Sequence, residues 1–202
     1  MVASVLLVLL SGLELSAQED VRSREVPEYK GRVNDYAGRL SHDSELILEH
    51  ISFQHEKEYG DRVLLLTIDS LKSNDAEDFA KRVLAQWDLA GTEASPTRVV
   101  LILLAVQEKR VRIQTSGGMK EDLPESVSAD VLGRAILPEL KKRHYSIGLY
   151  RGFREITDHL TQVHEKRRRI EREDKKNSRT DAQKENSEDS KGSDQDSNSS
   201  EK

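Results

Sequence analysis

The sequence predicts an α/β fold in which helices cover both faces of a small sheet, and two adjacent stretches carry this prediction. Residues 99–106 (VVLILLAV) form an unbroken apolar run, which is typical of a strand buried on both faces. Residues 109–115 (KRVRIQT) alternate between polar and apolar side chains, as a half-buried strand near a sheet edge does. The polar connection between them is short, so we expect the two strands to pair as a hairpin.

The segments before this hairpin alternate between helix and strand, as they do in α/β folds. Ser41 is a preferred N-cap residue and predicts a helix that ends before Gly60. Residues 62–68 (RVLLLTI) predict a second buried strand. Apolar side chains at helical spacing then predict an amphipathic helix that places Phe79 and Trp87 in the core.

Two helices are predicted after the hairpin. Residues 126–142 have helical periodicity, and Pro138 should kink or split that helix because proline lacks a backbone N–H. The last helix begins near residue 144 and carries Gly148 and Gly152, which allow another element to pack closely against it.

Both ends of the 202-residue chain differ from this core. Residues 1–18 have the short apolar run and small residues of a secretory signal peptide, which would be removed. Residues 19–26 are a polar lead-in and residues 27–165 are the predicted domain. Residues 166–202 form a charged tail that we expect to be disordered, since it has too little apolar surface to bury.

Composition excludes several classes of protein. The chain has no cysteine, so disulfides and cysteine-based metal or catalytic sites are ruled out. Its net charge of −5 argues against a nucleic-acid partner. A Cys-free exported protein is most simply periplasmic, or secreted from a bacterium. We expect no transmembrane segment in the mature chain, a monomer, and a protein partner in the envelope or at a membrane complex.

Acidic residues supply the candidate metal site. Ligands of open α/β sheets bind beyond the carboxyl ends of the strands, and we assign the loop after the 62–68 strand and the loop of residues 116–125 to that position. Oxygen ligands suit Ca²⁺ or Mg²⁺. The alternative is that such carboxylates are solvated, because the chain has 37 acidic residues. The candidate metal ligands are Asp35, Asp69, Glu121, Asp122 and Glu125.

The basic runs have simple explanations. Residues 141–143 (KKR) fall at a predicted helix C-terminus, where cations are favoured without any ligand. Residues 166–169 (KRRR) read as a solvated helix face, with a membrane-surface or anionic-partner role as the alternative. The sequence contains no H-E-x-x-H, G-x-S-x-G or Walker motif.

The order and spacing of these segments resemble the TPM domain family. The resemblance implies a three-layer αβα sandwich around a small mixed sheet, and Asp35 occupies the family's acidic position. Some bacterial members are described as binding Ca²⁺ in loops above the sheet. A plant thylakoid member is linked to photosystem II repair and to acid phosphatase activity. The segments that carry the resemblance are 33–41 (VNDYAGRLS), 63–68, 79–87, 99–106, 110–113, 136–138 (ILP) and 145–149 (YSIGL).

Two departures from the family pattern lie in loops. The family often has G-x-G-L-E-G followed by an Asp after the hairpin, whereas this chain has SGGMKE at residues 116–121 and Glu125 in place of the Asp. The family usually has Gly after the tryptophan, and here Asp88 follows Trp87. Of the glycine motif only Gly118 is clearly kept.

Three functions follow as hypotheses. The first is an exported TPM-type module that binds a divalent cation and serves protein interaction or the assembly or maintenance of a membrane complex. The second is a metal-dependent phosphatase for phosphomonoesters, in which Asp35 and Glu125 hold a metal that activates water. The third is an interaction domain without a ligand. The sequence favours the first, since it lacks an evident nucleophile, general base or basic phosphate clamp.

Overall fold

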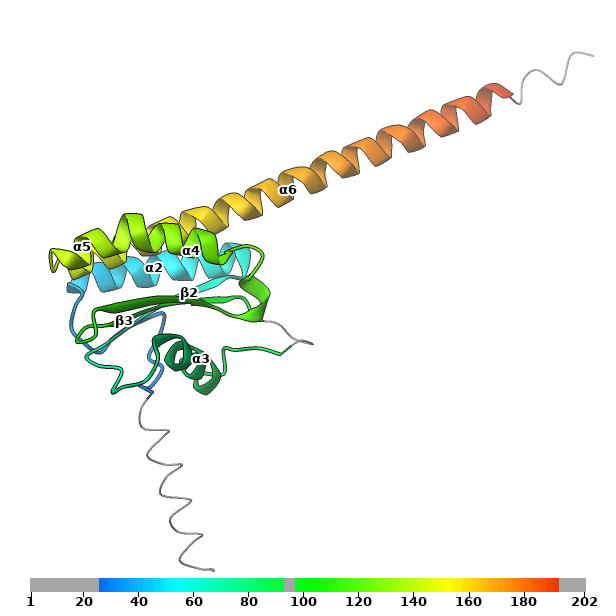
Figure 1. Cartoon of the computed structure of the whole chain (residues 1–202). Helices are drawn as coiled ribbons and strands as arrows, with labels where there is room; N and C mark the ends of the chain where they lie inside the picture. The colour runs from blue at the N-terminus through cyan, green and yellow to red at the C-terminus, as the bar shows by residue number, and fades with distance from the viewer. Residues whose placement is uncertain (1–25, 93–96, 193–202) are drawn as a thin grey trace, which may run out of the picture. The chain divides into compact units, whose positions relative to one another are not determined.

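The described part of the chain contains one four-stranded mixed sheet (Figure 1). The computed structural model describes residues 26–92 and 97–192, so the predicted signal peptide of residues 1–18 lies outside the described residues. The first three strands run parallel, and the last pairs antiparallel with the third, which confirms the predicted hairpin. The strands lie in the order β1 (Val33–Asp35), β2 (Arg62–Ile68), β3 (Val99–Ala105) and β4 (Arg110–Thr115).

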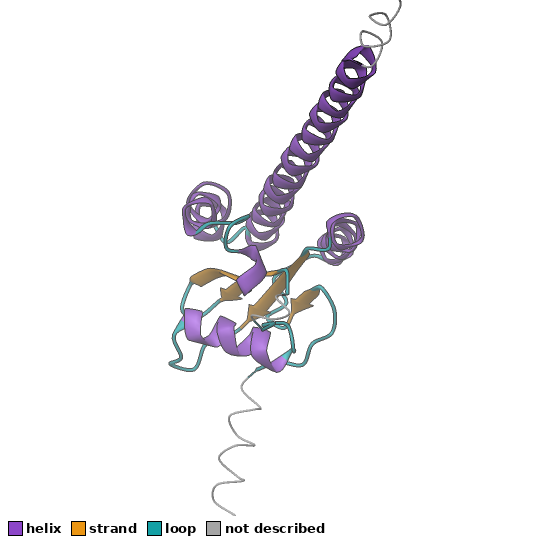
Figure 2. Cartoon of the chain, turned by 90° about the vertical axis from the view of Figure 1, so that its right-hand side faces the viewer, coloured by secondary structure: helices purple, strands orange, loops and turns teal. Residues whose placement is uncertain are grey.

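Helices cover both faces of this sheet and confirm the predicted αβα sandwich (Figures 1 and 2). Helix α3 (Ala76–Gln86) lies on one face. The other face carries α2 (His42–Tyr59), α4 (Glu125–Val131), α5 (Leu137–Lys141) and the first turns of α6 (Tyr145–Gly192).

Strand β3 explains why residues 99–106 are apolar without alternation. Every residue of β3 is buried. Leu101 and Leu103 pack in the core on the α3 side, whereas Ile102 and Leu104 pack in the core beneath α2 and α6. Since a helix layer covers each face, neither set of side chains reaches water.

The predicted helix signals are found where the sequence placed them. The Ser41 side chain accepts a hydrogen bond from the Ser44 backbone N–H and caps α2. Gly60 ends α2 with φ 80°, a left-handed conformation that glycine adopts without strain. Leu48, Ser52 and His55 are buried on α2, whereas the Ile47 side chain is 48% exposed.

Pro138 does split its helix. A π-helical turn (η2, Leu132–Ile136) separates α4 from α5, and Pro138 lies in the first turn of α5, where no backbone N–H is needed. The backbone N–H of Leu137 donates to the Leu132 carbonyl, five residues back, which accommodates the proline.

Gly148 and Gly152 allow α6 to approach η2 and α5 closely, as predicted. A Cβ atom on Gly148 would lie 2.7 Å from a Leu140 methyl carbon. A Cβ atom on Gly152 would lie 2.3 Å from two side-chain carbons of Ile136. Both positions therefore require the absence of a side chain.

The chain divides after Leu160 into two units, and residues 161–192 are described by themselves as the continuation of α6. This differs from the expected disorder after residue 165. Residues 161–191 contain no Pro or Gly and are rich in Glu, Lys and Arg, which favour helix even without a core to pack on. Among the described helices none is long and apolar enough to cross a membrane.

Candidate functional site

Asp35 organises the turn that follows β1. Its two carboxylate oxygens accept hydrogen bonds from the backbone N–H groups of Arg39, at 3.0 Å, and Leu40, at 2.8 Å. The Thr67 hydroxyl donates to Asp35 and accepts from the Ala37 backbone N–H. These bonds close the turn and fix the backbone of Arg39 beyond the carboxyl end of β1.

A second loop at the same edge of the sheet is held by Glu108. Its carboxylate accepts hydrogen bonds from the Ser70 hydroxyl, at 2.7 Å, and from the Leu71 backbone N–H, at 3.0 Å. The hydrogen bond from Ser70 lowers the pKa of Glu108. This link joins the exit of β2 to the β3–β4 turn, whose last residue, Lys109, has a φ of 52°.

The end of α5 contributes a third segment. Arg143 follows the helix with a φ of 64°, at the position where helices usually have glycine. The Glu139 carboxylate contacts Lys142, His144 and Arg151, and its hydrogen bond with His144 lowers the pKa of Glu139. Neither Lys141 nor Arg143 has such a partner among the described residues.

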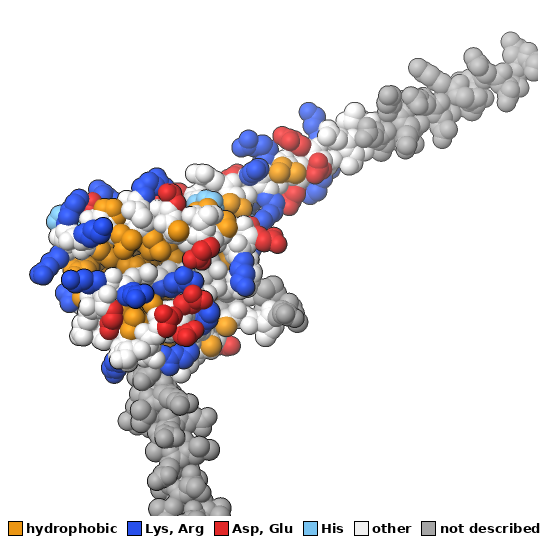
Figure 3. All heavy atoms as spheres, viewed as in Figure 1, with side chains coloured by type: hydrophobic (Ala, Val, Ile, Leu, Met, Phe, Trp, Pro, Cys, Tyr) orange, Lys and Arg blue, Asp and Glu red, His pale blue; other side chains and the backbone are white. Residues whose placement is uncertain are grey.

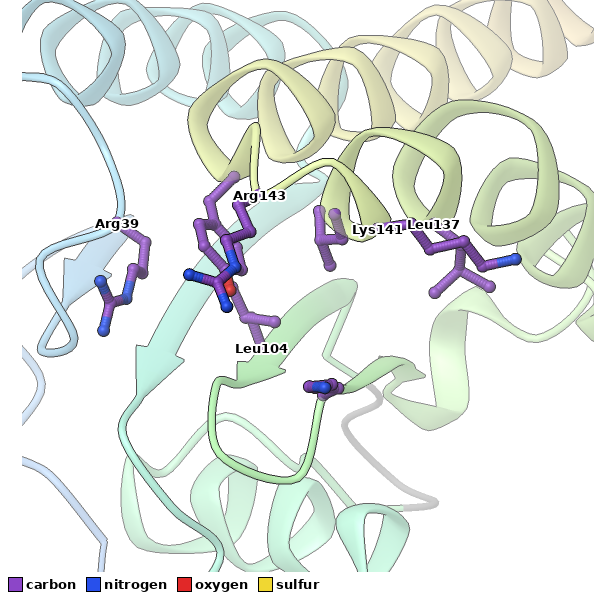
Figure 4. A pocket seen from close by; sticks show the side chains of 8 residues that line it. Arg39, Leu104, Leu137, Lys141 and Arg143 are labelled. Atoms are coloured by element: carbon purple, nitrogen blue, oxygen red, sulfur yellow. The ribbon is translucent and has the colours of Figure 1, made fainter.

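These three segments surround a cavity of about 580 Å³ (Figure 4). Four cations line it and no acidic residue does. The guanidinium of Arg39 stacks over the Tyr145 ring at 5.5 Å, and its Nε is buried without a hydrogen-bond partner. No ion pair is found for any of the four cations within the described residues. The lining residues are Arg39, Lys109, Lys141 and Arg143, with Leu104, Leu137, Leu140 and Tyr145.

The predicted metal ligands lie at opposite edges of the sheet. Asp35 is the last residue of β1 and Asp69 follows β2, so both lie at the carboxyl edge. Because β4 runs antiparallel to β3, residues 116–125 follow it at the opposite edge. Seven residues of β3 at about 3.3 Å each separate the two edges by about 20 Å. The assignment of residues 116–125 to the carboxyl edge is therefore wrong.

At that opposite edge Asp122 takes part in a partly buried ion pair. Arg98 donates to the Asp122 carboxylate at 2.6 Å and to the carboxylate of Asp61, which is fully buried. Burial alone would lower the pKa of Arg98, but the hydrogen bonds to Asp61 and Asp122 raise it overall. His159 Nε2 lies 2.9 Å from the Asp122 carbonyl oxygen, so this loop is tied to α6 as well.

The remaining predicted ligands are also separate. Glu121 is exposed in the loop after β4. Glu125 is exposed at the start of α4 and pairs with Arg112 of β4 at 3.1 Å. Among the described residues no three His, Asp or Glu side chains are grouped to hold a metal ion. With Asp35 engaged in its own turn and Asp122 bound to Arg98, the five residues do not fit a shared Ca²⁺ or Mg²⁺ site.

The structure explains two positions of the family's glycine pattern, the kept Gly118 and position 88, where Asp replaces the glycine. A Cβ atom on Gly118 would lie 2.7 Å from the Thr97 carbonyl oxygen, so this glycine cannot carry a side chain. Asp88 follows α3 with a φ of 56°, the left-handed conformation that glycine at this position would adopt freely. The backbone of this turn is therefore left-handed with Asp in the glycine position.

The cationic cavity was not predicted from the sequence. Lys141 and Arg143 were explained as helix-end cations and were not connected with Arg39 or Lys109. The predicted hairpin could have indicated part of this cluster, because it places residue 109 at the same edge as the turn after β1, which carries Arg39. The left-handed backbone at residues 109 and 143 could not be predicted from the sequence pattern.

Comparison with known proteins identifies the family. The TPM domain matches residues 33–159, well over half of the chain. No protein among the functionally curated ones matches. Among solved structures, the N-terminal domain of a P. gingivalis protein is similar at 24% identity, with a TM-score of 0.60, over 65% of this chain and 82% of that one.

Two further solved structures share the fold. The BA42 protein of Bizionia argentinensis is 20% identical, with a TM-score of 0.51, over 61% of this chain and 82% of that one. The N-terminal domain of the cg2496 protein of Corynebacterium glutamicum is 18% identical, with a TM-score of 0.50, over 66% and 83%. At such identities these structures support the fold alone. By the match over residues 33–159, the chain belongs to the TPM domain family.

Proposed function

We propose that this TPM domain is a binding module that holds an anionic group in the cavity at the carboxyl edge of its sheet. The observation that carries the proposal is that four cations and no acidic residue line this cavity. Like charges that gather around a cavity repel each other, and a bound anion removes that repulsion. The position also agrees with the general rule that α/β sheets bind ligands beyond the carboxyl ends of their strands.

Binding is favoured over phosphomonoester hydrolysis. A phosphatase needs a nucleophile or a metal-activated water beside the phosphate. The eight lining residues include no carboxylate, histidine, serine or cysteine. Arg39, Lys141 and Arg143 are suited to hold a phosphate-like charge but provide no group to cleave it.

The other elements of the hypothesis stay proposals with tests of their own. Binding of Ca²⁺ or Mg²⁺ must raise the melting temperature of the full chain, and no rise at millimolar metal would exclude it. Export through residues 1–18 must leave a shortened mature chain outside the cytoplasm, which an intact mass of the fractionated protein checks.

Calorimetric titration of the full chain with sulfate tests the anion proposal. We expect saturable binding that weakens as sodium chloride screens the charges. Arg143→Ala should weaken sulfate binding at least tenfold, because a charge-assisted hydrogen bond contributes about 1.5–3 kcal/mol. Lys142→Ala is the matched control, since Lys142 is bound to Glu139 and does not line the cavity. Equal binding by the wild type and Arg143→Ala would contradict the proposal.

A further inference from the structure

The cavity has an apolar component that an inorganic anion does not use. Three leucines line it beside the four cations. Leu137, the first residue of α5 after the π-helical turn, is 36% exposed, whereas Leu104 is fully buried at the end of β3. Figure 3 shows hydrophobic side chains gathered below α5, with Lys and Arg side chains along the border of that patch.

This combination of an apolar floor with a cationic rim defines the chemistry of a ligand. Leu137 exposes apolar surface to water, and covering that surface is favourable. The cations at the rim disfavour a neutral or cationic molecule, since either would leave their mutual repulsion in place. Resting on the proposed anion site, we propose that the ligand is an amphiphilic anion, a single molecule with one acidic head group and an apolar tail or ring.

The backbone adds a separate reason to assign the cations to a ligand. Lys109 and Arg143 both have left-handed backbone conformations, with φ of 52° and 64°. Glycine adopts this conformation without strain, whereas a residue with a Cβ atom does not. Two strained positions around one cavity both carry a cation that lines it. Strained residues of this kind cluster at functional sites, which supports a functional role for these two cations.

Three soluble probes separate the head group from the tail. Sulfate tests the head alone, octyl sulfate below its micelle concentration tests both, and octyltrimethylammonium has the same tail with the opposite charge. We expect octyl sulfate to bind the full chain at least tenfold more tightly than sulfate, because burial of about two methylene groups is enough for that factor. Octyltrimethylammonium should not bind.

Two variants assign the components of the site. Leu137→Ser should weaken octyl sulfate binding but leave sulfate binding unchanged, whereas Arg143→Gly should weaken both. Lys142→Ala should change neither. Thermal melting of each variant shows whether it is folded before it is titrated. For the Leu137→Ser protein, an unchanged affinity for sulfate also shows that the cationic part of the site is intact.

The outcomes distinguish this inference from the proposed function. Sulfate binding with no gain from the octyl tail would overturn the amphiphile and leave the anion site in place. No binding of either anion would overturn both proposals. Binding to vesicles with anionic lipid, without binding of monomeric octyl sulfate, would replace the single-molecule ligand with a membrane surface and so overturn the inference.

Discussion

Asp35 uses its carboxylate within its own turn. Its two oxygens accept from the N–H groups of Arg39 and Leu40 and from the Thr67 hydroxyl, so the most recognisable acidic residue of the family motif has a structural explanation here. Asn34 has a similar role at the preceding position, where its side-chain oxygen accepts from the Lys30 backbone N–H at 2.9 Å. The motif was identified from the sequence. The sequence did not reveal that its polar side chains accept hydrogen bonds from backbone N–H groups and so fix the turn.

Replacement of Asp35 should therefore affect stability first. We expect Asp35→Ala to lower the free energy of unfolding by about 2–3 kcal/mol, since two backbone donors and one hydroxyl lose a charged acceptor. Asp35→Asn keeps one acceptor and should cost about half as much. Urea denaturation of the full chain measures both.

Asp69→Ala is the control for this series. Asp69 is an exposed carboxylate at the same edge of the sheet, and its loss should change stability by less than about 0.5 kcal/mol. An Asp35→Ala protein as stable as the wild type would show that the turn does not depend on this carboxylate.

At the scale of elements, the direction of β4 decides what the following loop can do. The sequence pattern correctly predicted the hairpin, both buried strands, the cap at Ser41 and the break at Pro138. The prediction did not take into account that an antiparallel β4 brings the chain back to the other end of β3. Residues 116–125 therefore lie at the edge opposite Asp35 and Asp69. Side chains at the two edges of a sheet cannot share an ion, however acidic both loops are.

Because α6 packs closely against η2 at Gly152, a side chain at residue 152 should destabilise the protein. Gly152→Ala should lower the free energy of unfolding by about 1–3 kcal/mol, because the new methyl group overlaps the Ile136 side chain. The gain in helix propensity, about 1 kcal/mol, offsets only a fraction of this cost. Thermal or urea denaturation of the full chain measures the difference.

Gly133→Ala provides the matched control. Gly133 is also helical, but a Cβ atom there would meet nothing within 4 Å. The same substitution should therefore leave stability unchanged or raise it by up to about 1 kcal/mol. If both variants were equally stable, steric packing at Gly152 would not be the reason for its glycine.

At the scale of the whole molecule, Glu56 links α2 to the strands beneath it. Its carboxylate accepts hydrogen bonds from Arg62, at 2.7 Å, and from Arg32, at 2.6 Å. Burial alone would raise the pKa of Glu56, but the hydrogen bonds from Arg62 and Arg32 lower it below the ordinary value of 4.5. Stability from this group is fully present above pH 4.5 and is lost as the pH falls through the lower, folded pKa.

Acid denaturation tests this link. Glu56→Gln should lower the free energy of unfolding by about 1–2 kcal/mol at pH 7. The difference from the wild type should shrink below pH 4.5, as the wild-type carboxyl becomes protonated. Chemical denaturation of both proteins from pH 7 to pH 3 measures it, and a difference that did not narrow in acid would argue against an ionic origin.

The sandwich could be predicted from the sequence, whereas the cavity and the full length of the last helix could not. Hydrophobic periodicity predicted the sandwich, because the order of apolar and polar residues along a strand shows whether one or both of its faces are buried. The cavity depends on cations from residues 39, 109, 141 and 143, which only the folded chain brings together. The continuation of the helix beyond residues 166–169 was not predicted, because a lack of apolar residues excludes a core but not an isolated, charged helix.

We propose that the cations around the cavity serve a bound anion. Sulfate titration of the Lys109→Gly/Arg143→Gly double variant, together with its melting curve, is the decisive experiment for this anion site. Glycine relieves the left-handed strain at both positions, so we predict a protein as stable as the wild type, or more stable by about 1 kcal/mol. Its affinity for sulfate should fall at least tenfold. A double variant that binds sulfate as tightly as the wild type would contradict the claim.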